Sequence, residues 1–274
     1  CIRDRDRGAE TRIAYSRDGI TFEDVWSGTK DQLETTSIER SALVHLPEGG
    51  WRLYISYVDP EDGRWMIGLV EADAPDAFDL RTTRPVLKAA DIATEGVKDP
   101  FIFEITGLYH MVVSHATVAQ AATPEDLHGE HDAYNTGLIL SSTGLATSTD
   151  GIHWQWEGEL LRPNPGAWDS YATRISTLWY RAPVWVALYD GSADVSMNYE
   201  EQCGMAHSFD LRTFYRVTRT GPLFPTPQGT GALRYFDVLA LPHATYFYYE
   251  MARPDGSHDL RVYRTGRGGG FGTE

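Results

Sequence analysis

Strand-like alternation of apolar and polar residues runs along most of this chain. Four segments carry charge at or near their start and then alternate: ERSALVHL from Glu39, KDPFIFEI from Lys98, TRISTLWY from Thr173 and LRYFDVLA from Leu233. An aromatic segment follows each: WRLYISY from Trp51, GLYHMVV from Gly107, VWVALYDG from Val184 and ATYFYYE from Ala244. Period-two alternation rich in β-branched and aromatic residues predicts pairs of β-strands.

Outer hairpins follow the paired strands. Residues Thr11 to Ser16 and Ile20 to Val25 flank an Asp-Gly turn, Leu145 to Ser148 and Ile152 to Gln155 flank another, and Met205 to Ser208 precedes a similar strand, Thr213 to Val217. Asp-Gly between alternating segments is a strong hairpin signal. First strands begin about 60 to 75 residues apart, and about seventeen strands in all are typical of a β-propeller. The sequence therefore predicts an all-β, five-bladed β-propeller with four-stranded antiparallel blades.

The pattern opens in the middle of a blade. The outer pair from Thr11 to Val25 has no inner pair ahead of it, so we expect the inner strands of the first blade to precede Cys1. The alternative is that another element fills the unpaired inner edge. We predict a single domain over 1–274, with blades over 11–264 and a flexible glycine-rich tail over 265–274.

Charge and composition limit the partners. The formal net charge of −15 argues against binding to nucleic acid or an anionic membrane. No apolar run is long enough to cross a membrane, and the opening CIRDRDRGAE is charged, which slightly favours a cytoplasmic location. The two cysteines, Cys1 and Cys203, match no metal-ligand pattern, so we expect no metal and no cofactor.

One long loop, Ala116 to Thr136, interrupts a blade. Charged and imidazole side chains gather in or next to it: His115, Asp126, His128, Glu130, His131 and Asp132. Loops of this length are often lids. A solvated surface loop is the favoured interpretation, with a lid or a metal site as alternatives.

The segment from Gly96 to Ser114, GVKDPFIFEITGLYHMVVS, resembles the Asp-Pro blade opening of the five-bladed propeller glycoside hydrolases, families 43, 32, 68, 62, 117 and 130. The outer hairpins SRDGITFE and TSTDGIHWQWEGELL are also similar to theirs. In families 43 and 32 the matching Asp stabilises the transition state or modulates a pKa, and in family 130 a Glu-Asp-Pro motif supplies the acid. The resemblance implies that Asp99 is catalytic, since glycoside cleavage needs paired carboxyl groups.

The chain departs from the family 43 pattern in the next blade. Thr173-Arg174 stands where the resemblance implies an acidic Glu. Glu200 and Glu201 are then the candidates for the acid, because Glu201-Gln202-Cys203 is loosely similar to the Glu-Cys motif of family 32. The alternative is that Glu200 and Glu201 are an exposed pair on a hairpin with no catalytic role.

Alignment of the four inner strands predicts a ring of Arg40, Asp99, Arg174 and Arg234, with Glu39 one place before Arg40. Guanidinium groups lining a pocket suit a carboxylate or phosphate. An acidic sugar or inorganic phosphate is therefore a candidate ligand, and structural salt bridges are the alternative.

Further substrate-binding candidates lie at the ends of the second strands and just before one inner strand. Second strands end near Asp59, His115, Asp190 and Glu250, and Asp169 lies ahead of an inner strand beside Trp168 and Tyr171, which could stack on a sugar. Packing between blades is the alternative for every aromatic residue. The sequence favours a glycoside hydrolase acting on carbohydrate; the alternatives are a glycoside phosphorylase and a non-catalytic, carbohydrate-binding propeller.

Overall fold

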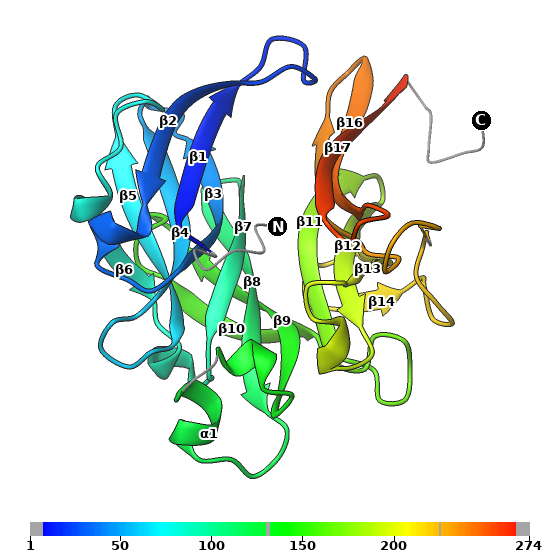
Figure 1. Ribbon diagram of the computed structural model, residues 1–274. Helices are drawn as coiled ribbons and strands as arrows, with labels where there is room; N and C mark the ends of the chain where they lie inside the picture. The colour runs from blue at the N-terminus through cyan, green and yellow to red at the C-terminus, as the bar shows by residue number, and fades with distance from the viewer. Residues whose placement is uncertain (1–7, 130–131, 225, 267–274) are drawn as a thin grey trace. The chain divides into compact units, whose positions relative to one another are not determined.

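The computed structural model describes residues 8–129, 132–224 and 226–266 (Figure 1). The chain forms two compact units, Cys1–Glu159 and Leu160–Glu274. Strands dominate both units, and β1 to β17 account for seventeen strands in the described residues, as the sequence predicts. No helix in this part of the chain has the length and apolar character needed to cross a membrane.

The first unit contains antiparallel sheets in chain order. Strand β1 (Glu10–Tyr15) pairs with β2 (Glu23–Thr29). A four-stranded blade follows, made of β3 (Ile38–His45), β4 (Trp51–Val58), β5 (Trp65–Ala72) and β6 (Arg84–Leu87). The next blade contains β7 (Val97–Ile105), β8 (Leu108–Val118), β9 (Ile139–Ser148) and β10 (Gln155–Leu161).

The second unit repeats the plan. Its first blade contains β11 (Ala172–Arg181), β12 (Val184–Ser192), β13 (Gln202–Ser208) and β14 (Phe214–Arg216). The last sheet has three strands, β15 (Leu233–Ala240), β16 (Ala244–Ala252) and β17 (His258–Gly266). Strand β17 therefore continues past Arg264, where we expected the tail to begin, and residues 267–274 lie outside the described residues.

Short helical turns occupy the loops between strands. They are α1 (Pro124–His128) and the 3-10 turns η1 (Lys30–Leu33), η2 (Leu80–Thr82), η3 (Ala90–Ile92), η4 (Ala133–Asn135) and η5 (Val195–Met197).

A Ser-x-Asp turn recurs in the outer hairpins and delays the start of the strand that follows, so β2 begins at Glu23 and not at the predicted Ile20, and β10 begins at Gln155 and not at Ile152. In the hairpin after β9, Asp150 Oδ1 accepts hydrogen bonds from the main-chain N–H of Ile152 and of His153, both at 2.8 Å. This Asx turn occupies residues that we predicted to be extended, so β10 begins only at Gln155. The same arrangement recurs at Asp18 and Asp210.

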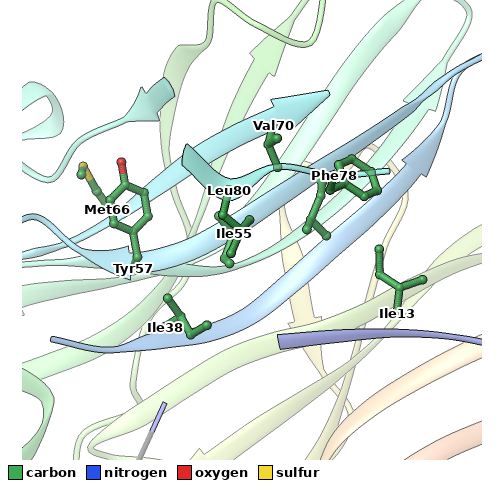
Figure 2. Packing of buried hydrophobic residues seen from close by; sticks show 9 residues of the cluster. Ile13, Ile38, Ile55, Tyr57, Met66, Val70, Phe78 and Leu80 are labelled. Atoms are coloured by element: carbon green, nitrogen blue, oxygen red, sulfur yellow. The ribbon is translucent and has the colours of Figure 1, made fainter. Parts of the chain in front are cut away.

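Apolar layers on both sides of the β3–β6 blade hold the first unit together. One cluster contains Ile13, Ile38, Ile55, Tyr57 and Leu80 and reaches the β1–β2 sheet (Figure 2). A second, with Tyr54, Ile67, Val97 and Met111 among its members, joins the opposite face to the β7–β10 blade. Neighbouring residues of β4 point to opposite faces, so this strand is buried on both. In the second unit, Leu188, Phe236 and Phe247 belong to a comparable cluster.

Candidate functional site

Each inner strand has an irregular pairing at or shortly after a charged residue. Glu39 with Ser56, Lys98 with Ser114 and Arg234 with Glu250 are the last regular pairs before the shift, whereas in β11 the pair of Ile175 with Tyr189 lies between Arg174–Asp190 and the shift. Counted on the second strand, Ser114, Asp190 and Glu250 each lie two residues after the first partner that follows the shift, so Lys98, and not Asp99, is equivalent to Arg174 and Arg234. The alignment behind the predicted ring therefore differs from the observed register by one residue at Arg40 and Asp99, which both lie on bulges.

Asp99 lies on the bulge of β7 in a backbone conformation that few residues adopt. Its φ is 59°, in the left-handed region, where non-glycine residues are uncommon. Its main-chain N–H donates to Ser56 Oγ at 2.9 Å, and the Ser56 hydroxyl donates to the Arg40 carbonyl, also at 2.9 Å. The side chain is buried, and neither carboxylate oxygen has a hydrogen-bond partner among the described residues. Such a group in a native protein requires an explanation, and a ligand-binding role is one.

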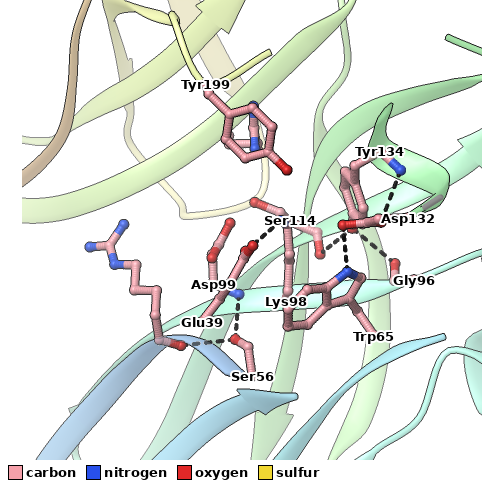
Figure 3. Close-up of polar contacts among 12 residues, drawn as sticks. Glu39, Ser56, Trp65, Gly96, Lys98, Asp99, Ser114, Asp132, Tyr134 and Tyr199 are labelled. Carbon is pink, nitrogen blue, oxygen red and sulfur yellow. Dashed lines mark hydrogen bonds and ion pairs between the residues drawn. The ribbon is translucent and has the colours of Figure 1, made fainter. Parts of the chain in front are cut away.

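Glu39 and Lys98 form an ion pair beside Asp99 (Figure 3). Lys98 Nζ lies 2.6 Å from Glu39 Oε2. The same ammonium lies 4.9 Å from the ring centre of Trp65 and 4.5 Å from that of Tyr134, which are cation–π distances. The Lys98 side chain is 3% exposed, whereas that of Glu39 is 24% exposed. Of the two carboxyl groups, Glu39 and Asp99, Glu39 is therefore the one that solvent reaches, because Asp99 is buried.

The surroundings of Glu39 favour its neutral form. Burial raises the pKa of the Glu39 carboxyl; Lys98 opposes that rise, and the negative charges of Asp99 and Asp132 add to it, so that the pKa stands above its ordinary value. A carboxyl group with a raised pKa, partly open to solvent, can serve as a proton donor near neutral pH.

The long loop is anchored to the blade and is not merely solvated, contrary to the favoured interpretation. Its Leu127, Ala133 and Tyr134 are buried. Asp132 accepts a hydrogen bond from Trp65 Nε1 at 2.7 Å, and His128 Nε2 lies 2.9 Å from Glu95 Oε2. Glu130 and His131 lie outside the described residues. The loop thus supplies part of the wall around Lys98.

His115 and Asp59 have contacts with other residues. His115 is buried, packs edge-on against Trp156, and has its Nε2 3.9 Å from Glu159 Oε2. Asp59 pairs with Lys88 at 2.8 Å.

In the second unit, Glu201 lies between the two arginines predicted to line the pocket. Its carboxylate forms ion pairs with Arg174 and, at 2.7 Å, with Arg234 Nη1, while Arg234 Nε donates to Glu250 Oε2 at 3.0 Å. Burial alone would raise the pKa of Glu201, but the two guanidinium groups outweigh it and lower the pKa to about 2. A carboxylate held in this way stays ionised at neutral pH, so it cannot donate a proton.

Glu200, the other candidate acid, points to different partners. Its carboxylate accepts a hydrogen bond from Thr230 and lies 3.2 Å from His258 Nε2 on β17. Glu200 and Glu201 are neighbours in the chain but belong to separate networks.

Asp190 and Asp169 have structural contacts of their own. Asp190 Oδ1 accepts from the main-chain N–H of Tyr235 at 2.9 Å. Asp169 accepts from Tyr189 and from Arg216 at 3.0 and 2.7 Å. Trp168 stacks on Tyr189 and donates to the Thr218 carbonyl, and Tyr171 is buried, so packing accounts for both aromatic residues beside Asp169.

In the part of the chain that the structure describes, no group of three or more His, Cys, Asp or Glu residues is placed to hold a metal ion. Cys203 is buried with a raised pKa caused by burial and by Asp190, and Cys1 lies outside the described residues.

Comparison with known proteins identifies the fold. No protein-family model matches the chain, and no curated protein matches it either. Among solved structures, an α-L-arabinofuranosidase from Lactobacillus brevis is similar with a TM-score of 0.65 and 14% identity, over 96% of this chain and 87% of that one. A thermostable family-43 glycoside hydrolase gives 0.64 and 10%, over 98% and 88%.

A β-1,2-mannobiose phosphorylase from Listeria innocua gives a TM-score of 0.59 and 18% identity over 92% of this chain. The chain spans 66% of that phosphorylase's length, slightly less than two thirds. The chain has the fold of the β-propeller glycoside hydrolases and phosphorylases. The all-β propeller prediction and the resemblance are confirmed at the level of fold; the number of blades and the single domain stay predictions.

Sequence reasoning missed several residues of the first-unit cluster. Lys98 stands in the Lys-Asp-Pro motif itself, and its position directly before Asp99 was the available signal. Ser56 could have been found from the strand register. Trp65 and Tyr134 come from β5 and η4, and no local pattern indicates that their rings meet at one ammonium.

Proposed function

We propose that this chain is a carbohydrate-active enzyme that hydrolyses a glycosidic bond, with Glu39 as proton donor and Asp99 as the carboxylate that keeps Glu39 protonated. The observation that carries the proposal is the pairing of these two carboxyl groups: Asp99 buried without hydrogen-bond partners, and Glu39 partly open beside it with a raised pKa. A carboxyl group with a raised pKa beside a second carboxyl group is typical of acid–base catalysis.

In the proposed reaction, the protonated Glu39 gives its proton to the glycosidic oxygen as the bond from that oxygen to the anomeric carbon breaks. The positive charge then developing on the sugar ring is stabilised by a nearby carboxylate, the role we assign to Asp99. Water adds to the anomeric carbon and releases a proton, which returns Glu39 to its acid form and completes the hydrolysis. The role of Asp99 agrees with what the Asp-Pro resemblance implies for families 43 and 32, whereas Glu39 takes the place of the acid that the family 43 pattern puts at Thr173-Arg174.

Phosphorolysis is the second candidate, because a phosphorylase is among the similar structures and two arginines occur at equivalent strand positions. Arg174 and Arg234 already form ion pairs, however, with the carboxylates of Glu201 and Glu250. An anionic ligand, whether phosphate or an acidic sugar, would have to displace a buried carboxylate. Hydrolysis of a neutral sugar is the better-supported reaction.

The test is a turnover screen with aryl glycosides and oligosaccharides, with and without inorganic phosphate. Wild-type protein is compared with Glu39→Gln, Asp99→Asn and the control Glu61→Gln, whose glutamate is 81% exposed. We expect phosphate-independent turnover that both site variants lose and the control keeps. Strict phosphate dependence would indicate a phosphorylase. Sugar binding without turnover in well-folded protein would indicate a binding propeller.

A further inference from the structure

Lys98 is a buried cation that the proposed acid–base pair does not by itself require. A buried ammonium is unfavourable unless it is paired or hydrogen-bonded. The Lys98 ammonium lies 2.6 Å from the Glu39 carboxylate and 4.5 and 4.9 Å from the ring centres of Tyr134 and Trp65. Three groups from β3, β5 and the β8–β9 loop thus converge on one ammonium.

The aromatic faces are themselves held in place by hydrogen bonds. Asp132 accepts from Trp65 Nε1 at 2.7 Å and, with its other oxygen, from the main-chain N–H of Tyr134 at 3.1 Å. The Tyr134 hydroxyl donates to the carbonyl of Gly96 at 3.2 Å, close before Lys98 in the chain. A lysine side chain is normally flexible, but here the surrounding rings fix the position of its ammonium. A charge fixed in this way can orient a partner carboxyl group.

We propose that Lys98 is a positioning residue for Glu39: caged by Trp65 and Tyr134, it holds the Glu39 carboxyl in one orientation and stabilises the carboxylate left after proton transfer. This inference rests on the proposed function. The proton goes from Glu39 to the leaving oxygen, the ammonium keeps its own protons throughout, and no further reactant is needed.

The charged groups that face Glu39 determine what removal of Lys98 does. They are Lys98 and Asp99 from β7 and Asp132 from the loop that carries η4. Lys98 alone among them favours the ionised form. Replacement by an uncharged residue therefore leaves two negative neighbours unopposed, and the Glu39 pKa rises. Glu39 then becomes a weaker acid whose orientation is no longer fixed.

The experiment measures the pH dependence of kcat/KM together with an NMR titration of the Glu39 side-chain carboxyl carbon. Variants are Lys98→Met, Lys98→Gln as a second uncharged form should the first fail to fold, and Lys98→Arg, which keeps the charge. Lys88→Met is the matched control, because Lys88 also pairs with carboxylates in this unit, Asp59 and Glu61.

For the uncharged variants we expect kcat to fall about 10- to 100-fold with little change in KM. We also expect the alkaline limb of the pH profile of kcat/KM, and the midpoint of the Glu39 titration, to move up by about one pH unit or more. In Lys98→Arg the alkaline limb should return most of the way to its wild-type pH, and Lys88→Met should behave as wild type. If the wild type turns over substrate but neither the alkaline limb nor the Glu39 titration moves in the uncharged Lys98 variants, the role of Lys98 is overturned and the proposed function stands. No wild-type turnover on any glycoside would overturn the proposed function, and the catalytic role of Lys98 with it, even if the titration moved.

Discussion

Ser56 holds the backbone of Asp99 from the neighbouring blade: the Asp99 N–H donates to Ser56 Oγ at 2.9 Å. The second unit contains the same device, in which the Tyr235 N–H donates to Asp190 Oδ1 at 2.9 Å. Asp99 and Tyr235 both have positive φ, 59° and 53°, on the bulge of an inner strand. A side chain on the second strand of one blade therefore stabilises an unfavourable backbone conformation on the next, and in the first unit this places the Asp99 carboxylate beside Glu39.

Asp99→Asn should remove activity and leave the fold intact. Asn tolerates the left-handed backbone better than most residues, so the substitution removes the charge without straining the bulge. We expect kcat to fall at least about 100-fold. Since Asp99 raises the Glu39 pKa, its loss also moves the alkaline limb of any residual activity to lower pH. Steady-state kinetics across pH and a thermal melt measure both effects.

The control for this variant is Asp73→Asn, which makes the same substitution at an exposed aspartate in the same unit. Wild-type rates in Asp99→Asn would remove Asp99 from the site. Equal loss in both variants would indicate a non-specific effect of charge.

Ser56→Ala should destabilise the protein, because it leaves the buried Asp99 N–H without its acceptor. An unsatisfied buried donor costs about 1–3 kcal/mol. Ser114 offers a matched control: it is the equivalent residue of the next blade, equally buried, and its hydroxyl has no hydrogen-bond partner among the described residues. Ser114→Ala should change the unfolding free energy by less than about 0.5 kcal/mol. Urea titration of both variants makes the comparison, and equal losses would contradict the proposed role of Ser56.

Local patterns predicted the strands well, because period-two alternation reports directly which faces are buried. They failed where a side chain competes with the strand. Asp150 extends its turn through its own carboxylate, so the start of β10 lies later than the alternation suggests. The bulge at Lys98 changes the register by an amount that alternation does not reveal, which is why Asp99 was aligned with Arg174.

The site was predicted only as far as a motif carried it. Asp99 stood out through Asp-Pro, whereas the cage around Lys98 depends on Trp65 and Tyr134, which contact it only through the tertiary fold. Glu201 shows the opposite error. Its local sequence suggested an acid, but Arg174 and Arg234, distant in the chain, keep it ionised.

Glu201→Gln should be among the most destabilising substitutions in the second unit. It leaves two buried guanidinium groups without their shared carboxylate, and breaking a buried ion pair costs about 3–5 kcal/mol. The neighbouring Glu200→Gln is the control, since Glu200 is 23% exposed and contacts Thr230 and His258 instead. Chemical unfolding at pH 7 should show the larger loss for Glu201→Gln. A loss as small as that of Glu200→Gln would contradict the account of this ion pair.

The lowered pKa of Glu201 also predicts how its contribution varies with pH. Its pKa is about 2 in the folded protein and near the ordinary 4.5 when unfolded, so the ionised form is favoured by folding. The stabilisation, on the order of 3 kcal/mol, is complete above pH 4.5 and disappears as pH falls toward 2. The difference in unfolding free energy between wild type and Glu201→Gln should therefore shrink over that range. A difference independent of pH would indicate that lost packing, and not lost charge, causes it.

Inorganic phosphate should bind the wild-type protein weakly, because Glu201 and Glu250 already form ion pairs with the guanidinium groups of Arg174 and Arg234. A ligand at 100 times its Kd stabilises a protein by about 2.7 kcal/mol, which is a rise of several degrees in Tm. We expect 10 mM phosphate to raise the wild-type Tm by less than about 1 °C relative to sodium chloride at equal ionic strength. In Glu201→Gln the uncovered arginines form a site for an anion, so the same phosphate should recover part of the lost Tm. A large phosphate-specific rise in the wild type would show that the arginines are available to anions despite these contacts, and would favour phosphorolysis over hydrolysis.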